Sequence, residues 1–228
     1  MAKPTILHRR LADDPMTKLF KEAKRNRPGL IGIYEFDYEE GRSEPSVADL
    51  MIAAGINGYI HAETGLTPED AYKPGQGTLG GMTVPVQNKY GEIKTIIFIR
   101  YNKSAPPSGV DMVNKMTMAH ELQHSDDYDS GAIKVGQADV LKSEYDAHQA
   151  ALKMGFANAD REAVGFYLAG LHSIVARGGK LAEAAQLMID SEQYPRYLKF
   201  AHIYFEKWQK LQVPPSDAET KINSDPSA

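Results

Sequence analysis

The sequence predicts an α+β fold, with a small mixed sheet in the first half and a mainly helical C-terminal half. Two observations indicate the sheet: runs rich in branched and aromatic residues, and a strong turn signal between two of those runs. The third observation is a change in spacing. After residue 110, apolar residues recur every three or four positions, which is typical of helices with one buried face.

The first elements expected along the chain are a helix, a strand and a second helix. Residues 16–25 read as a short basic helix, and a Pro-Gly break separates it from a strand expected at 30–36. Ser46 stands where a helix cap is needed, because apolar residues follow it at helical spacing, and Gly55 stops that helix.

A glycine-rich segment and a hairpin come next. Residues 73–81 (KPGQGTLGG) are expected to form a loop and not a phosphate cradle, because no Gly-Lys-Ser/Thr follows and no helix begins there. Residues 82–87 and 93–101 read as two strands joined by a turn at 88–91. The apolar spacing from Val110 onward then predicts a helix that packs against the sheet.

The chain beyond this helix is expected to be helical almost to its end. Glycine and proline residues divide it into four helices, at residues 137–154, 160–177, 180–189 and 194–211. A chain of 228 residues is long enough for one large domain, so we expect a single domain at residues 1–212, with 1–28 as its lead-in.

Residues 213–228 are expected to be disordered, since the stretch VPPSDAETKINSDPSA is rich in Pro, Ser and acidic residues and has no apolar face. Deleting everything after Gln212 is therefore expected to leave folding and activity intact. Thermal unfolding of the full and shortened chains tests this. A melting temperature lowered by many degrees in the shortened chain contradicts it.

The composition excludes several classes of function. A net charge of -4 offers no general attraction to nucleic acid. No apolar run approaches the roughly 20 residues that span a bilayer, and the charged start lacks a signal-peptide core. The chain has no cysteine, so a metal would be held by His, Asp or Glu. These features suit a cytoplasmic protein, or one exported without a cleaved signal peptide.

The segment AHELQHSDD, residues 119–127, contains the pattern His-Glu-x-x-His. With 7 His and 15 Glu in 228 residues, this pattern is expected about 0.01 times per chain by chance. His120 and His124 are four apart, so on a helix both present ring nitrogens on one face and can bind one zinc ion. Glu121 lies about 100° round the helix, where it suits a general base better than a third ligand.

A third ligand has to come from another part of the chain. Glu144 and His148 are also four apart, on the next expected helix, so either can meet the metal, whereas Asp146 points away. The acidic residues at 126–129 are the nearest rivals. Those directly after His124 continue the helix, where a carboxylate more easily orients a histidine than binds the metal.

This arrangement resembles the zincin metallopeptidases, and within them the gluzincins, whose third ligand is a glutamate about twenty residues after the second histidine. Glu144 is twenty residues after His124. The resemblance implies a small zincin-like sheet with an active-site helix, and a zinc site formed by His120, His124 and Glu144. It also implies hydrolysis of a protein or peptide substrate by zinc-activated water, with Glu121 as general base.

Several assignments stay open at this point. His148 is either an alternative third ligand or, like Asp127, a residue hydrogen-bonded behind the ligands. A Tyr or His that stabilises the developing oxyanion is expected, with four candidates: Tyr128, Tyr145, Tyr167 and His172. The remaining histidines are each expected on the surface or in the core and not on the metal: His8, His61, His172 and His202.

The substrate and the class of function are also open. An extended peptide can pair with the edge of a sheet, and residues 93–101 are an edge candidate, although a fully buried strand fits them equally well. The alternative to an enzyme is a non-catalytic zincin-like domain for binding or regulation. A regulatory peptidase with a single partner protein would have the same site as a general peptidase.

Overall fold

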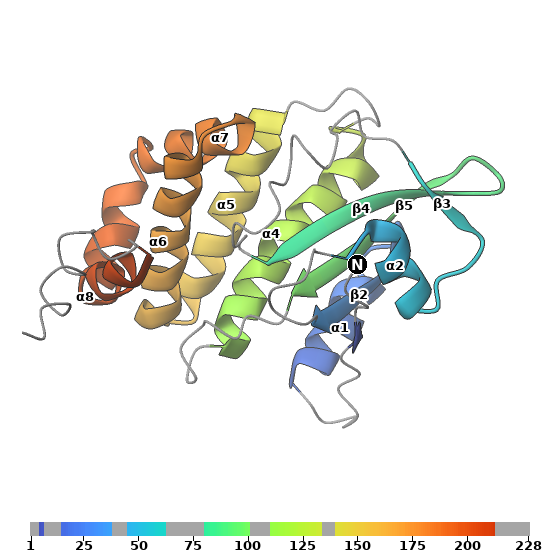
Figure 1. Ribbon diagram of the computed structural model, residues 1–228, viewed down its shortest axis with the longest axis horizontal. Helices are drawn as coiled ribbons and strands as arrows, with labels where there is room; N and C mark the ends of the chain where they lie inside the picture. The colour runs from blue at the N-terminus through green and yellow to red at the C-terminus, as the bar shows by residue number, and fades with distance from the viewer. Residues whose placement is uncertain are drawn as a thin grey trace, which may run out of the picture.

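The computed structural model describes residues 5–6, 15–37, 45–62, 80–100, 110–133 and 140–212. Within these ranges the protein is a mixed α+β structure whose C-terminal part is helical, as expected (Figure 1). The glycine-rich segment up to residue 79, the tail at 213–228 and His8 lie outside them. In the described part of the chain every helix is too short or too polar to cross a bilayer.

Five strands of the described chain form one sheet in the order β1-β2-β5-β4-β3. Their bounds are Thr5–Ile6 (β1), Leu30–Asp37 (β2), Tyr59–His61 (β3), Gly81–Asn88 (β4) and Ile93–Arg100 (β5). Strands β2 and β5 are parallel, and the other neighbours are antiparallel. The hairpin β4–β5 is the one expected from the sequence.

The two faces of the sheet are covered by different helices. Helices α1 (Pro15–Arg25) and α4 (Val110–Ser130) lie on one face, and α2 (Val47–Ala53) lies on the other. Because strand side chains alternate, Ile97 packs with the α4 cluster while its neighbour Phe98 packs with the α2 cluster. Helix α4, which carries His120 and His124, is therefore packed directly against the sheet.

The strand at 93–101 is central, and its interpretation as a sheet edge was wrong. Strand β5 lies between β2 and β4, so both of its sides are hydrogen-bonded to neighbours. Residues Thr95 to Ile99 are fully buried, which is typical of a strand covered on both faces. The fully buried alternative is confirmed for residues 95–99, whereas Ile93 is exposed, Lys94 and Arg100 are half-buried, and Tyr101 lies outside the described ranges.

Four more helices complete the described part of the chain: α5 (Val140–Ala157), α6 (Arg161–Arg177), α7 (Lys180–Ile189) and α8 (Tyr194–Gln212). Helix α6 is central, because every residue from Ala163 to Leu171 is buried. Gly165 lets α8 approach it closely. A Cβ added there would lie 2.6 Å from the backbone nitrogen of Phe205, so the two backbones touch where a side chain would otherwise separate them.

Local signals located the helices well and the shortest strands poorly. Ser46 caps α2 as expected, since its hydroxyl accepts from the Asp49 backbone N–H and the Asp49 carboxylate accepts from the Ser46 N–H, both at 3.1 Å. Strands β1 and β3 were not expected. They have two and three residues, which is too few to show an alternating pattern.

Candidate metal centre

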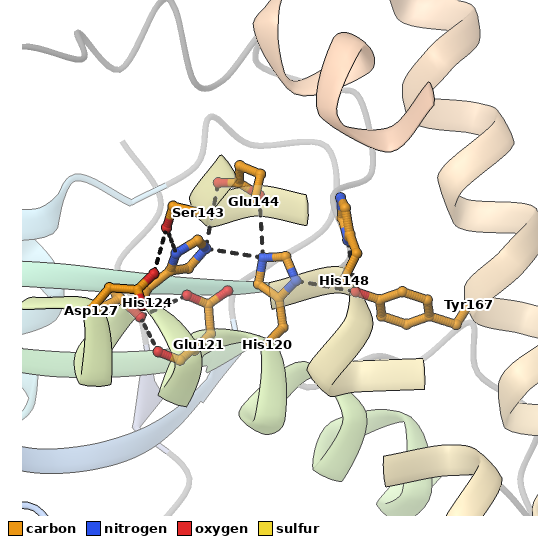
Figure 2. A network of polar contacts seen from close by, with 9 residues as sticks. His120, Glu121, His124, Asp127, Ser143, Glu144, His148 and Tyr167 are labelled. Carbon is orange, nitrogen blue, oxygen red and sulfur yellow. Dashed lines mark hydrogen bonds and ion pairs between the residues drawn. The ribbon is translucent and has the colours of Figure 1, made fainter. Parts of the chain in front are cut away.

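Helix α4 presents His120 and His124 on the face that meets α5. Their Nε2 atoms are 3.2 Å apart. Figure 2 shows both rings turned toward the carboxylate of Glu144, which comes from α5. Two imidazole lone pairs and a carboxylate thus converge on one small volume. Without a cation or a shared proton between them, these groups would repel one another.

The spacing of the donor atoms fits a tetrahedral metal site. The Glu144 oxygens lie 3.4 Å from Nε2 of His120 and 3.5 Å from Nε2 of His124. A regular tetrahedron whose corners are about 2.0–2.1 Å from its centre has edges of about 3.3–3.4 Å. The His120 distance is to Oε2 and the His124 distance to Oε1, so one oxygen of Glu144 faces each histidine, and the three side chains approach the spacing of such a site. Among the described residues, no other His, Cys, Asp or Glu joins this group.

The charge of Glu144 suits a ligand. Burial raises the pKa of its carboxyl group, but the charges of His124 and His120 and a hydrogen bond to His120 outweigh burial and lower the pKa to about 2. Its side chain is only 19 % exposed, so these neighbours act on it with little screening by solvent. Glu144 is therefore an anionic donor at neutral pH.

A short chain of hydrogen bonds orients His124. Its Nδ1 is 2.8 Å from the Ser143 hydroxyl, and that hydroxyl donates to Oδ2 of Asp127 at 3.0 Å. Since the single Ser143 proton goes to the carboxylate, the hydroxyl can only accept from Nδ1–H of His124. That tautomer leaves Nε2 unprotonated and free to bind a metal. Asp127 thus acts through Ser143 and is not part of the group formed by His120, His124 and Glu144.

His120 shares a hydrogen-bond partner, the buried Tyr167, with a third histidine, His148. The Tyr167 hydroxyl, from α6, lies 3.2 Å from Nδ1 of His120 and 3.0 Å from Nδ1 of His148. Burial and the charge of His120 lower the pKa of His148 to about 3, against the opposing charge of Glu144. His148 is therefore neutral, and it contacts Tyr167 but does not belong to the three-donor group.

Glu121 lies beside the donors and is held by strand β4. The Thr83 hydroxyl is 2.8 Å from both Oε2 and the backbone oxygen of Glu121. Gly81 leaves room for the other oxygen, because a Cβ there would lie 2.6 Å from Oε1. Burial raises the pKa of Glu121 to about 7, although His124 and the Thr83 hydrogen bond lower it. The group can thus take up and release a proton near neutral pH.

No family model, curated protein or solved structure matches the chain. The metal centre therefore rests on the donor atoms and their surroundings. His120, His124 and Glu144 form a cluster that could hold a metal ion.

The other residues singled out in the sequence lie in different surroundings. Asp126 forms a two-point ion pair with Arg27, at 2.6 and 2.8 Å. Of the four oxyanion candidates, Tyr167 alone has a hydrogen bond to the site's histidines. The Tyr145 hydroxyl accepts a hydrogen bond from Gln149, and His172 is hydrogen-bonded to Tyr194. His202 pairs with Glu206 on the surface of α8, and the His61 side chain lies outside the description.

Three contributors to the site were not expected from the sequence: Gly81, Thr83 and Ser143. Each depends on packing between elements, such as β4 against α4, which local periodicity does not encode. The one clue was the position of Ser143 directly before Glu144 on the same helix.

Proposed function

We propose that this protein is a zinc-dependent metallopeptidase in which Glu121 is the general base. The supporting observation is a buried carboxylate that is not part of the donor group, held beside it by Thr83. A purely structural zinc site needs no such carboxylate, and it closes its fourth position with another Cys or His. Here three donors leave that position for water or substrate.

Zinc fits the donor set. Two imidazoles and one carboxylate, with no thiolate, are a common set for catalytic zinc. His120, His124 and Glu144 would hold the ion. When bound, zinc polarises a carbonyl oxygen and makes water a stronger acid.

Both proton transfers are then made by Glu121, which Thr83 holds in place. Thr83 holds Oε2 of Glu121, so Oε1 is the oxygen that accepts the proton from the attacking water. The same carboxylic acid next donates this proton to the leaving nitrogen. A pKa of about 7 suits both steps, because neither the acid nor the base form is strongly disfavoured at neutral pH.

The substrate we propose is an extended segment of protein or peptide, paired with strand β4. Strand β3 pairs only with residues 86–88 of β4, and the backbone N–H of Ala62 donates one further hydrogen bond to the Pro85 carbonyl. From Met82 to Val84, none of the described residues pairs with that side of β4. This stretch includes Thr83, so a peptide added there as a strand would pass Glu121.

The first test is metal content. We expect the purified protein to bind about one zinc ion per chain, and His120→Ala combined with His124→Ala to abolish this binding. His172→Ala is the matched control, because this histidine is partly buried beside Tyr194 and lies outside the donor group. Elemental analysis gives the result. A protein without transition metal after zinc reconstitution would overturn the proposal.

A non-catalytic zincin-like domain for binding or regulation is the alternative. It would bind zinc with the same three residues, but hydrolysis would be absent, and replacing Glu121 would change no activity. Mass spectrometry of new peptide termini in an extract treated with the zinc-loaded protein separates the two functions. It also separates a general peptidase from one that cleaves a single partner.

A further inference from the structure

One tyrosine hydroxyl lies between two histidines, and only one of the two belongs to the donor group. Tyr167 is 1 % exposed, and its described hydrogen bonds are the two to Nδ1 of His120 and Nδ1 of His148. The rings of the two histidines are 4.9 Å apart, centre to centre. Figure 2 shows His120 and His148 approaching the hydroxyl from different sides, one from α4 and one from α5.

The number of available protons limits which hydrogen bonds Tyr167, His120 and His148 can form with one another. A phenol has one proton, and a neutral imidazole has one N–H. If Nε2 of His120 binds a metal, its Nδ1 keeps the proton and donates to the Tyr167 oxygen. The Tyr167 proton then has one acceptor left among the described residues, Nδ1 of His148, so His148 has its proton on Nε2.

Assigning the metal to His148 instead reverses the direction of both hydrogen bonds of Tyr167. If His148 bound the metal through Nε2, its Nδ1 would donate to Tyr167, and Tyr167 would donate to His120. His120 would then have a proton on Nε2, the atom that faces His124 and Glu144. If both histidines donated, the Tyr167 proton would be buried without an acceptor, which is costly.

We propose that Tyr167 makes His120 and His148 mutually exclusive as metal ligands, and that it assigns the metal to His120. This inference rests on the proposed zinc site. Tyr167 is thus a positioning residue that acts through His120, and His148 accepts the Tyr167 hydrogen bond through Nδ1 and is not a third imidazole ligand. Its Nε2–H has no partner in the described part of the chain and points away from Tyr167 (Figure 2).

Nuclear magnetic resonance of the zinc-loaded protein tests the assignment directly. Long-range proton–nitrogen correlations report which ring nitrogen of each histidine is protonated. We expect Nδ1–H for His120 and His124, whose Nε2 resonances shift when zinc is added, and Nε2–H for His148. A zinc-loaded protein in which His148 is protonated at Nδ1, or binds zinc, overturns the inference while the zinc site stands.

Zinc affinity tests the positioning role. We expect Tyr167→Phe to weaken zinc binding about 10–100-fold in competition with a chelator, the range found for partners behind metal ligands. Tyr194→Phe is the matched control, because it removes the hydroxyl from another tyrosine–histidine pair, Tyr194 and His172, outside the donor group.

Equal affinities of the two variants would overturn the role of Tyr167. If Tyr167→Phe does not fold, the histidine tautomers measured by nuclear magnetic resonance in the unaltered protein decide whether the inference holds. A failure of the unaltered protein to bind zinc would overturn the proposed function, and this inference with it.

Discussion

Replacing Glu121 by glutamine is expected to reduce peptide hydrolysis by about 10²–10⁴-fold, the usual contribution of a general base, while zinc content and fold are unchanged. The amide has nearly the shape of the carboxylate and can still accept the Thr83 hydrogen bond through its oxygen. It cannot accept the proton of water. The fall is therefore expected in kcat, with little change in KM.

The measurement uses a peptide identified from the new termini in the treated extract, with zinc content determined on the same samples. Glu183→Gln is a matched control, because Glu183 is exposed on α7 and outside the donor group. This control is expected to retain full activity. Near-normal turnover by Glu121→Gln would remove Glu121 as the base, even if the protein binds zinc as proposed.

Glu144→Ala is expected to weaken zinc binding by more than about 100-fold, whereas His148→Ala weakens it by less than about tenfold. Glu144 supplies the charged donor atom, with oxygens 3.4 and 3.5 Å from the two imidazole nitrogens. His148 is hydrogen-bonded to the hydroxyl behind His120 and is not part of the donor group. Losing it removes an acceptor for Tyr167 and leaves all three donors in place.

Both affinities come from competition titrations with a chelator, and thermal unfolding checks that each variant is folded. The reverse order of affinities would assign the third ligand to His148. Glu144 would then be an outer partner of a three-histidine site. Because the two residues lie one turn apart on the same helix, this pair of variants also controls for general effects on α5.

The fold class was predictable because its signals are local. The apolar spacing gave α4 and the four helices after it, and a turn between two apolar runs gave the hairpin β4–β5. The position of β5 was not predictable. Its apolar run fits an edge or a central strand, and only the parallel partner β2, more than fifty residues earlier in the chain, decides between them.

The residues of the candidate site also separate into those that the sequence predicts and those that it does not. His120 and His124 are brought together by one helical turn, and the sequence shows that spacing directly. Glu144 needed the resemblance to a known ligand spacing in addition. Thr83 and Tyr167 reach the site from β4 and α6, and their contacts span 38 and 47 residues of chain. A single sequence has no pattern that marks such pairs.

The contact between α6 and α8 has a consequence for protein design. A fragment ending at Ala157 would contain all three metal donors and the general base, yet it would lack the phenol that orients His120. Transplanting the His-Glu-x-x-His helix with its glutamate partner is therefore insufficient to rebuild this centre. The C-terminal helices, with Gly165 setting how closely two of them approach, have to be transplanted as well.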